Sequence, residues 1–549
     1  MSHLKPSPIR FGTSSACLAR QRMRPLLLTF ALGWQLSAVG QQAQAPVSTK
    51  TASPSFLIRG FDIQGENPLP AGDVSKVLAP FLRADGTIET LQKATAALES
   101  ALRDRGFVLH RVALPPQEVG DTVTLNIVKF VIGKIAMDGQ KSYSNGNIRA
   151  SVPELLEGTA PNFRTLAVQT AIANENPGKQ IQISLKESEQ ADKIDARILV
   201  KEAKPWNLVV NMSNNGSNAT GNDRVTVAGG HNNLFDLDHQ MTAAYTTSFE
   251  RMSDVKQVGL NYRVPAYRQG GVFGWSYTHS DVVGDFGAFR STGAGQTLGL
   301  NYNHYLPPSG GFRSYVLVAL DDKQFNVTEI NGIGLAGQTV RRSRPFSLGY
   351  NARLDSDTAA WSYSADLVVN LPGGHGNDLT SYQSEDTRIT TARWTALRGS
   401  ANYASSLSGG WLWSAKGQFQ YSGHTLIAGE QFGIGGASSV RGTGERPISG
   451  DRGAFLSAEI AGPELAPGLR LMGFVDAGWL SNNNPNGNPK PAHDSLSSAG
   501  VGLRYSLPGF SLSAEYGRVI SGSSLPFAVG SGLPQSGDQK LHISVSARF

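Results

Sequence analysis

A two-residue alternation of apolar and polar side chains runs through residues 205–549, and it constrains the fold more than any other feature of the sequence. The last ten residues, KLHISVSARF, show it most clearly, because one face of a strand would carry Leu541, Ile543, Val545, Ala547 and Phe549. Successive side chains of a β-strand point to opposite faces, so the pattern predicts strands with one apolar and one polar face. Such strands build either a soluble sandwich with an apolar core or a transmembrane barrel whose apolar face contacts lipid.

The lengths of the connections favour the barrel. Residues 205–549 hold about sixteen alternating segments, a number in the range of outer-membrane barrels. Short links at 265–271, 307–311, 406–410 and 508–509 take turns with long polar links at 281–293, 326–343, 373–385, 424–452, 482–494 and 521–538. Short periplasmic turns and long external loops alternate in this way in even-stranded outer-membrane barrels. We therefore predict a transmembrane antiparallel β-barrel over residues 205–549.

Residues before 205 follow a different pattern, which occurs twice in the order strand, helix, helix, strand, strand. The predicted helices cover 71–82 and 87–107 in the first unit and 145–156 and 163–174 in the second. In the second helix of the first unit, apolar residues recur at helical spacing: Leu91, Ala94, Leu98 and Leu102. The pattern predicts two α/β domains, 56–130 and 131–204. Their order of elements resembles the POTRA domain of periplasmic parts of outer-membrane transporters.

The N-terminus has the composition of an export signal. Arg20, Arg22 and Arg24 precede the apolar run PLLLTFALGWQLSAVG, which ends in small residues. We predict a signal peptide at 1–40 and a short linker at 41–55. Without the five basic residues of 1–40, the formal net charge falls from +6 to +1, so charge gives little support for nucleic-acid binding. The one cysteine, Cys17, also lies in this segment, which excludes disulfides and thiolate chemistry from the mature chain.

Motifs for catalysis or cofactor binding are not supported by their context. Residues 332–337, GIGLAG, match the glycine spacing of a dinucleotide site, and Asp355 follows about twenty residues later. The stretch lies in a long loop without the helix start that would hold a pyrophosphate. The ten histidines are scattered, and no metal-ligand spacing is evident. We therefore expect no enzyme activity, no cofactor and no metal site.

A glycine-rich stretch at 433–444, GIGGASSVRGTG, contains a single charge, Arg441. An arginine folded into a barrel lumen needs a carboxylate, because removing a charge from water is costly unless the charge is paired. The segment GLRLMGFVDAGWL offers one at Asp476. Its alternation would turn Leu469, Leu471, Val475, Ala477 and Trp479 to lipid, and Arg470, Phe474, Asp476 and Gly478 to the lumen.

The two motifs together resemble those of the two-partner secretion transporters, the TpsB family. Val440, Arg441 and Gly442 match the family's VRG motif, and FVDAG on a nearby strand matches its partner motif. The resemblance implies that residues 423–452 turn into the barrel and that Arg441 pairs with Asp476, with Phe474 and Gly478 flanking that partner. It extends over nearly all of residues 56–549.

Two features depart from the family pattern. Thr443 stands where the family often has an aromatic residue after VRG. Many members also carry an N-terminal helix that plugs the pore, which would need roughly 20 residues to cross a barrel of ~30 Å. Only 15 residues separate the predicted cleavage site from Phe56. We expect the plug to be missing or vestigial.

The resemblance implies an outer-membrane transporter that recognises one large exoprotein, of the haemagglutinin or haemolysin type, and translocates it without ATP. The POTRA-like domains would lie in the periplasm and capture the unfolded client. The barrel would contact outer-membrane lipid and be inserted by the assembly machinery, with Phe549 as the terminal signal and also as an aromatic-girdle residue. The alternatives are an assembly factor or insertase of the same superfamily, a passive porin, and an enzyme carried on a barrel.

Overall fold

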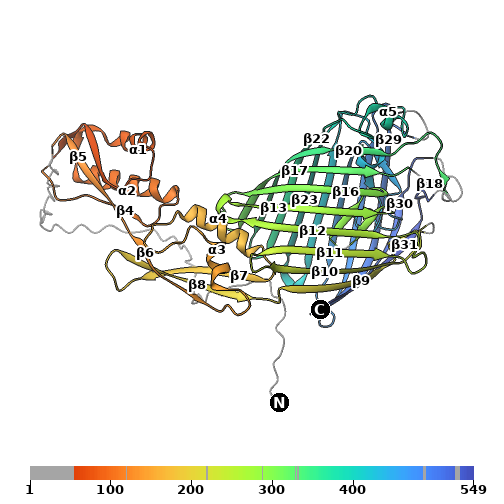
Figure 1. The fold of residues 1–549 in the computed structure, drawn as a ribbon, viewed down its shortest axis with the longest axis horizontal. Helices are drawn as coiled ribbons and strands as arrows, with labels where there is room; N and C mark the ends of the chain where they lie inside the picture. The colour runs from red at the N-terminus through yellow and green to blue at the C-terminus, as the bar shows by residue number, and fades with distance from the viewer. Residues whose placement is uncertain are drawn as a thin grey trace, which may run out of the picture. The chain divides into compact units, whose positions relative to one another are not determined.

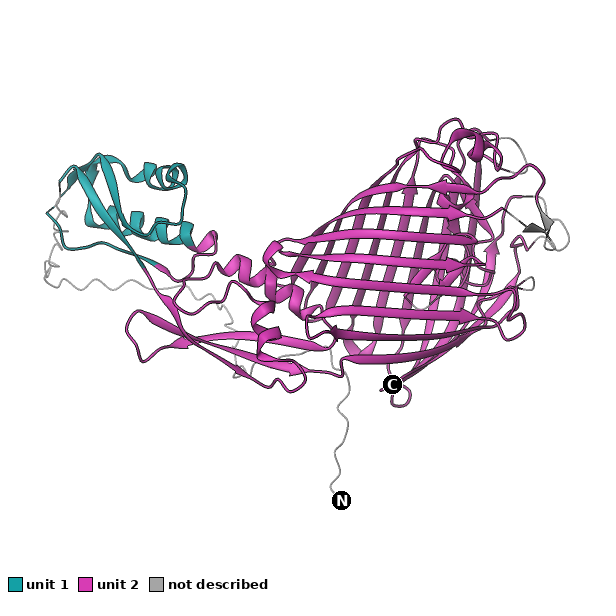
Figure 2. Cartoon of the chain, viewed as in Figure 1, with its two compact units in different colours: residues 1–102, 111–128 teal, residues 103–110, 129–549 magenta. Residues whose placement is uncertain are grey.

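The computed structural model describes residues 55–118, 120–217, 220–286, 288–327, 329–330, 333–485, 490–525 and 532–549. The predicted signal peptide and nearly all of the predicted linker lie outside these residues, as does part of the stretch 332–337. The chain divides into two compact units (Figure 2). One holds residues up to 102 and 111–128, and the other holds 103–110 and 129–549.

The first unit has the predicted α/β composition. Its elements are β1 (Phe56–Ile58), β2 (Gly60–Gly65), α1 (Ala71–Leu78), the 3₁₀ turn η1 (Ala79–Phe81), β3 (Arg83–Gly86), α2 (Ile88–Asp104), β4 (His110–Ala113) and β5 (Thr122–Lys129). The end of α2 from residue 103, the first residue of β4 and the last residue of β5 belong to the second unit. The sheet has the order β2-β5-β4, and β2 runs parallel to β5. The predicted apolar stripe of α2 is buried: Leu91, Ala94, Leu98 and Leu102. The strand β3, which pairs with β1, was not predicted, because its sequence RADG has no apolar alternation.

The second unit begins with another small α/β fold. Its elements are β6 (Val131–Asp138), α3 (Asn145–Ser151), α4 (Phe163–Asn174), β7 (Lys179–Glu187) and β8 (Lys193–Glu202). The central β8 is parallel to β6 and antiparallel to β7. Side-chain oxygens cap both helices: Ser144 accepts from the Asn147 amide, and Asn162 accepts from the Arg164 and Thr165 amides. The second module therefore has the predicted order strand, helix, helix, strand, strand, and the first departs from it by the strand β3 between its two helices.

The rest of the second unit is a closed antiparallel barrel of sixteen strands (Figure 1). The strands are β9 (Trp206–Ser213), β10 (Arg224–Leu234), β11 (His239–Thr247), β12 (Gln257–Ala266), β13 (Gly271–Ser280), β16 (Gly295–Tyr305), β17 (Phe312–Phe325), β21 (Pro345–Asp355), β22 (Ala359–Asn370), β23 (Thr395–Ser406), β24 (Leu412–Tyr421), β27 (Arg452–Ala461), β28 (Leu469–Ser481), β29 (His493–Leu507), β30 (Phe510–Ser521) and β31 (Gln539–Arg548). A short strand, β20 (Arg341–Ser343), precedes β21 and pairs with the end of β17. The predicted fold class is thus confirmed.

The long connections contain smaller elements. These are the hairpins β14 (Gly284–Phe286) with β15 (Phe289–Ser291), β18 (Glu329–Ile330) with β19 (Ile333–Gly334), and β25 (Phe432–Ile434) with β26 (Ile448–Gly450), and the helix α5 (Leu379–Gln383). The short connections lie at the opposite end of the barrel. One of them holds a 3₁₀ turn, η2 (Tyr267–Gln269). No helix within the described ranges is long and apolar enough to cross a membrane.

The barrel turns alternate side chains outward, as its sequence predicts. On β31, Leu541 is 44 % exposed and Ile543 37 %, whereas His542 between them is buried. The barrel closes where β31 pairs with β9, and there the Phe549 amide donates a hydrogen bond to the Leu208 carbonyl at 2.9 Å. The exposed apolar face of each strand therefore forms a continuous outer surface suited to lipid.

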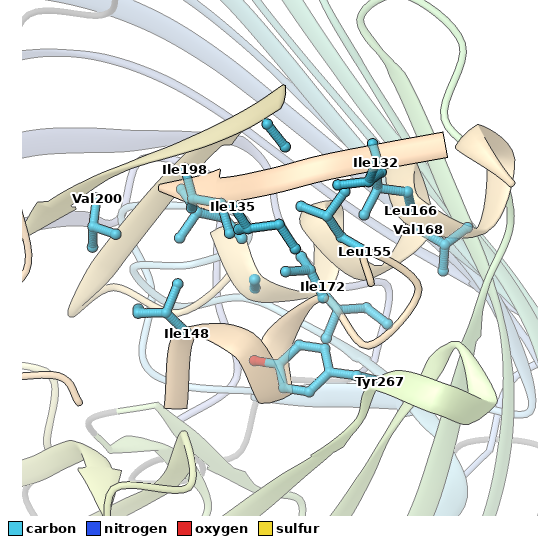
Figure 3. Close-up of a cluster of buried hydrophobic side chains, with 14 of the residues drawn as sticks. Ile132, Ile135, Ile148, Leu155, Leu166, Val168, Ile172, Ile198, Val200 and Tyr267 are labelled. Carbon is cyan, nitrogen blue, oxygen red and sulfur yellow. The ribbon is translucent and has the colours of Figure 1, made fainter. Parts of the chain in front are cut away.

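The second α/β module is packed onto the short-turn end of the barrel. Its core of isoleucine, leucine and valine side chains includes barrel residues from the turns and strand ends: Tyr267, Val272 and Tyr305. Figure 3 shows the Tyr267 ring beside Ile148 and Ile172. Because this shared core is apolar and continuous, the module and the barrel end bury their surfaces against each other.

A buried ion pair lies at the same junction. Lys179 Nζ of β7 lies 2.5 Å from Asp238 Oδ2 in the turn between β10 and β11, and their side chains are 0 % and 2 % exposed. Lys179 also donates to Asn147 Oδ1 and Ser151 Oγ, each at 2.6 Å. Tyr267 Oη donates to the same carboxylate at 2.6 Å. Burial lowers the pKa of Lys179, and Asp238 opposes that shift.

We predict that Lys179→Met loosens this junction, because it leaves the Asp238 carboxylate buried without a cation. Breaking a buried pair costs about 3–5 kcal/mol. Hydrogen exchange of the α3 and α4 amides in detergent measures the free energy of local opening. Lys201→Met, at an exposed position of β8, is the matched control. Equal exchange rates in the two variants would contradict the structural role of the pair.

Candidate functional site

The connection between β24 and β27, residues 422–451, folds back into the barrel and is called the inward loop here. Its β25–β26 hairpin and Val440 pack against lumen-facing apolar side chains of the wall: Phe455, Leu480, Leu496 and Val519. These side chains alternate along their strands with exposed ones such as Leu456 and Trp479. The inward loop therefore lies inside the barrel and covers the sector of the wall formed by β27 to β30.

Arg441 is the centre of this contact, and its side chain is only 2 % exposed. Its Nε donates to Asp476 Oδ2 at 2.8 Å and its Nη2 donates to Asp476 Oδ1 at 2.7 Å, so the ion pair is bidentate. Nη1 donates to Glu459 at 2.6 Å and to Glu515 at 2.9 Å. Nη2 also donates to Ser457 Oγ at 3.1 Å. All five guanidinium N–H groups thus have acceptors.

The backbone and an aromatic ring complete the arrangement. The Arg441 amide donates to Asp476 Oδ2 at 3.1 Å, and the Arg441 Cζ lies 3.5 Å from the centroid of the Phe474 ring. A cation over an aromatic face is attracted by the ring's quadrupole. Gly478 leaves room for the inward loop, because a Cβ there would lie 2.7 Å from Ile434 Cδ1. The structure therefore brings Arg441, Asp476, Phe474 and Gly478 together.

The charges around Arg441 form a balanced group. Arg504 Nη1 lies 3.0 Å from Glu459 Oε2, and its Nη2 lies 2.8 Å from Glu515 Oε1. Lys416 reaches the inward loop and donates to the Ser438 carbonyl at 3.1 Å. Three cations thus accompany the three carboxylates of Glu459, Asp476 and Glu515, which limits the cost of removing them from water.

Sequence reasoning missed four members of this group: Lys416, Glu459, Arg504 and Glu515. The sequence did contain a signal for them. Each lies in a predicted strand at a position that alternates with the lipid-facing residues and therefore faces the lumen. The motif comparison pointed only to Asp476, since the other carboxylates lie outside the matched motifs.

Gly442 permits the tight turn beside Arg441. Its φ is +92°, and a Cβ there would lie 2.8 Å from the Gly517 carbonyl oxygen on β30. Its amide donates to His542 Nε2 at 3.1 Å. A side chain at this position would be strained by the backbone and would collide with the wall.

Thr443 stabilises the turn in place of a larger side chain. Its Oγ1 accepts from the Gly436 amide at 3.0 Å and donates to the Val440 carbonyl at 3.0 Å. The hydroxyl thus links the two arms of the turn that carries Arg441. A small residue with both a donor and an acceptor meets the requirements of this buried position.

A second anchor ties the inward loop to another sector of the wall. The buried carboxylate of Glu430 accepts from Ser343 Oγ at 2.7 Å and Arg398 Nη2 at 2.8 Å, and it lies 3.2 Å from Lys323 Nζ. Gln420 Nε2 donates to the Glu430 carbonyl at 2.9 Å. The inward loop is therefore held at its tip by Arg441 and near its start by Glu430.

The described residues hold no cluster of His, Cys, Asp and Glu side chains suited to a metal ion. Arg441 and Glu430 of the inward loop instead form ion pairs with side chains of the barrel wall. This arrangement positions a loop in a lumen. It defines the class of the protein: an outer-membrane barrel with POTRA domains, whose pore is shaped by an inward-folded loop.

Comparison with known families gives the same result. The model of the haemolysin secretion/activation protein ShlB/FhaC/HecB matches residues 192–505, and that of the ShlB-type POTRA domain matches residues 56–129. The chain belongs to this family of two-partner secretion outer-membrane transporters. The predicted family is confirmed, and so is the predicted location in the outer membrane with POTRA domains in the periplasm. Members of the family are transporters and not enzymes.

Relatives and solved structures are similar over most of the chain. The outer membrane transporter CdiB of Dickeya dadantii (strain 3937) is 24 % identical over 465 residues, covering 82 % of this chain and 81 % of that protein. The heme/hemopexin transporter protein HuxB of Haemophilus influenzae (strain 86-028NP) is 20 % identical over 398 residues, covering 70 % and 68 %.

Two solved structures share the fold. CdiB from Escherichia coli has a TM-score of 0.69 at 19 % identity, covering 92 % of this chain and 93 % of that one. CdiB from Acinetobacter baumannii has a TM-score of 0.68 at 18 % identity, covering 93 % and 94 %. Both likenesses concern the fold alone.

We predict that Gly442→Ala displaces the inward loop, because the substitution combines a left-handed backbone with a collision at Gly517. Strain of this kind costs about 1–3 kcal/mol, and about 1.4 kcal/mol corresponds to a tenfold change in an equilibrium. A cysteine at Val440, which is fully buried, reports the displacement by its rate of maleimide labelling. We expect labelling to be about tenfold faster or more in Gly442→Ala.

Gly444→Ala is the matched control, since a Cβ at Gly444 meets nothing within 4 Å. Its labelling rate should equal that of the parent. If Gly442→Ala also left the rate unchanged, the close approach of the inward loop to β30 would not hold the loop in place.

Proposed function

We propose that this transporter exports one large exoprotein of the haemagglutinin or haemolysin type, in unfolded form and without ATP. The observation that carries the proposal is the Arg441 cluster, which holds a loop inside the barrel of a secretion family. The description of the family, haemolysin secretion/activation protein, supports a secreted protein as the cargo.

In this proposal the Arg441–Asp476 pair holds the inward loop so that a polypeptide chain can pass through the pore. The loop at the same time limits the leakage of other solutes. A loop tied by charge-assisted hydrogen bonds has few alternative positions, because moving it would strand buried charges. Val440 and Gly442 fit the loop against the wall, and Phe474 and Gly478 shape the surface that receives Arg441. The part of the loop around Arg441 then keeps its position on the wall while the client passes.

The periplasmic domains would capture the client by extending a sheet. Among the described strands of the second module, β6 and β7 each pair only with β8, so each has one unpaired edge. An extended chain can add to such an edge through main-chain hydrogen bonds. Binding through the main chain suits an unfolded client, and side-chain contacts would then select one client among many.

The remaining assignments follow from the same proposal. Residues 1–40 would be the signal peptide that directs export, and residues 41–55 would link it to the first periplasmic domain. Residues 56–130 and 131–204 would form the two POTRA domains, and residues 205–549 would form the barrel. Phe549, paired with β9 through its backbone, would guide insertion by the outer-membrane assembly machinery. Folding of the client outside the cell would supply direction in a compartment without ATP.

Deletion of the gene tests the proposed function. We expect the culture medium or cell surface to lose one large protein, while other outer-membrane barrels keep their amounts. Mass spectrometry of the medium and of outer membranes measures both. General loss of outer-membrane barrels would instead assign the protein to assembly or insertion and would contradict export of a single client.

We predict that Arg441→Ala reduces secretion at least about tenfold, because it leaves Glu459, Asp476 and Glu515 to repel one another in a buried site. Arg441→Lys keeps the charge without the planar fork and should retain an intermediate level. Secreted client is measured by immunoblot or mass spectrometry, and barrel insertion by heat-modifiable migration.

The matched control is Arg470→Ala. Arg470 also lies on β28, but it contacts the Gly410 and Gly462 carbonyls and Glu464 at the periplasmic turns. Its secretion should stay near the parent level. Normal secretion by an inserted Arg441→Ala barrel would refute a role for the arginine in export.

A further inference from the structure

A second long connection also enters the barrel. The predicted external loop 281–293 contains the β14–β15 hairpin, and Phe289 of this hairpin packs on Ala244 of β11. A Cβ at Gly259 on β12 would lie 2.3 Å from the Phe289 ring, so this glycine makes space for it. Ala244 is buried between the exposed side chains of Met241 and Tyr245, which places the contact on the lumen side. The β14–β15 hairpin therefore lines the β11–β12 sector from inside.

A polar cavity of about 400 Å³ lies between this hairpin and the inward loop. Its third side is the barrel wall at β22, β23 and β24, which contributes Ser364, Asp366, Arg398, Ser400 and Gln418. The strands that carry the partners of Arg441 begin with β27, which follows β24 around the barrel and contributes Phe455 to the edge of the cavity. Within the described lumen, the two inward segments thus leave space along β22 to β24.

The wall of this cavity carries groups that can bind a peptide main chain. Asp366 Oδ1 is buried without a hydrogen-bond partner among the described residues. The hydroxyls of Ser364 and Ser400 lie 2.8 Å apart and form a hydrogen bond with each other. An extended chain presents an N–H and a C=O at every residue, so exchangeable polar partners of this kind suit its passage.

Four residues that line the cavity join the two inward segments to each other and to the wall, and we call them the staple: Thr292, Gly429, Glu430 and Arg446. Thr292 Oγ1 donates to the Gly429 carbonyl at 2.8 Å, and Arg446 Nη1 donates to the Thr292 carbonyl at 2.5 Å. Glu430 fixes the same point to Lys323, Ser343 and Arg398 of the wall.

We propose that the exported chain passes through this cavity, along β22 to β24, and that the staple is the gate at its external end. The inference rests on the proposed function, since it assigns a path to the client. Opening requires that the staple separates while the Arg441 cluster stays closed. The two anchors of the inward loop thus have different roles: Arg441 holds the loop, and Glu430 and Arg446 release it.

Substituted cysteines locate the path without a client. The mature chain as predicted has no cysteine, so a single cysteine can be placed at Ser364 or Ser400 on the cavity wall. Ser498→Cys is the matched control, because Ser498 also faces the lumen but is buried in the sector behind the inward loop. The readout is ionic current through the full-length protein in phosphatidylcholine planar bilayers, before and after addition of sulfonatoethyl methanethiosulfonate.

We expect the reagent to reduce the current severalfold for Ser364→Cys and Ser400→Cys and to leave Ser498→Cys unchanged. A block at Ser498→Cys with none at the other two positions would place the path on the Arg441 side and overturn the proposal. Equal block at all three positions would also contradict a path confined to β22 to β24.

Glu430→Ala tests the gate, and we expect it to raise the current severalfold in the same bilayers. Ser343→Ala, which removes one hydrogen bond to Glu430, provides a milder variant if Glu430→Ala does not insert, and it should raise the current less. Asp355→Ala, at an exposed periplasmic turn, is the control for loss of a paired carboxylate. Parent-level current in every inserted staple variant would overturn the gate.

Secretion of the client, measured in the same cysteine variants without reagent, separates the two claims. If secretion is normal and the block pattern differs from the expected one, the path is wrong and export stands. If gene deletion removes no secreted protein, the proposed function itself fails, whatever the current shows.

Discussion

The guanidinium of Arg441 is surrounded by three carboxylates, a serine hydroxyl and an aromatic ring, and the position of the inward loop depends on this contact. An arginine without partners could not remain buried beside the apolar wall side chains that the inward loop contacts, because its charge would lose water without compensation. With every N–H group of the guanidinium paired, moving the loop away from the wall would leave buried charges without partners. The glycines at 442 and 478 then allow the loop backbone to approach the wall closely.

The same principle acts at two other places in the second unit. Lys179 and Asp238 tie the second α/β module to the barrel, and Glu430 ties the start of the inward loop to Arg398 and Lys323. Each is a buried charge with several partners, which gives position more than net stability. The transporter is thus a barrel with an apolar outer face, and polar contacts inside it hold the inward loop and the second α/β module in position.

Much of this fold could be predicted from sequence, because alternation and helical spacing are local signals. They indicated the barrel, its short and long connections and both α/β modules. The pairing of Arg441 with Asp476 was predicted from the resemblance of two motifs and from the alternation that places Asp476 on the lumen face of its strand. Glu515 was missed, although the alternation along its strand places it on the lumen face. The position of Phe289 inside the barrel could not be predicted from the sequence. The course of a long loop depends on contacts distant in sequence, such as Phe289 with Gly259, which periodicity does not record.

A double-mutant cycle on Arg441 and Asp476 tests the central claim most directly. Protection of a cysteine at position 440 from maleimide would be measured in the parent, in Arg441→Ala, in Asp476→Ala and in the double variant. The account predicts strong coupling: the double variant should lose no more protection than Arg441→Ala alone, with an interaction energy of about 1 kcal/mol or more. Additive losses, or full protection in both single variants, would contradict a loop held in the lumen by this pair.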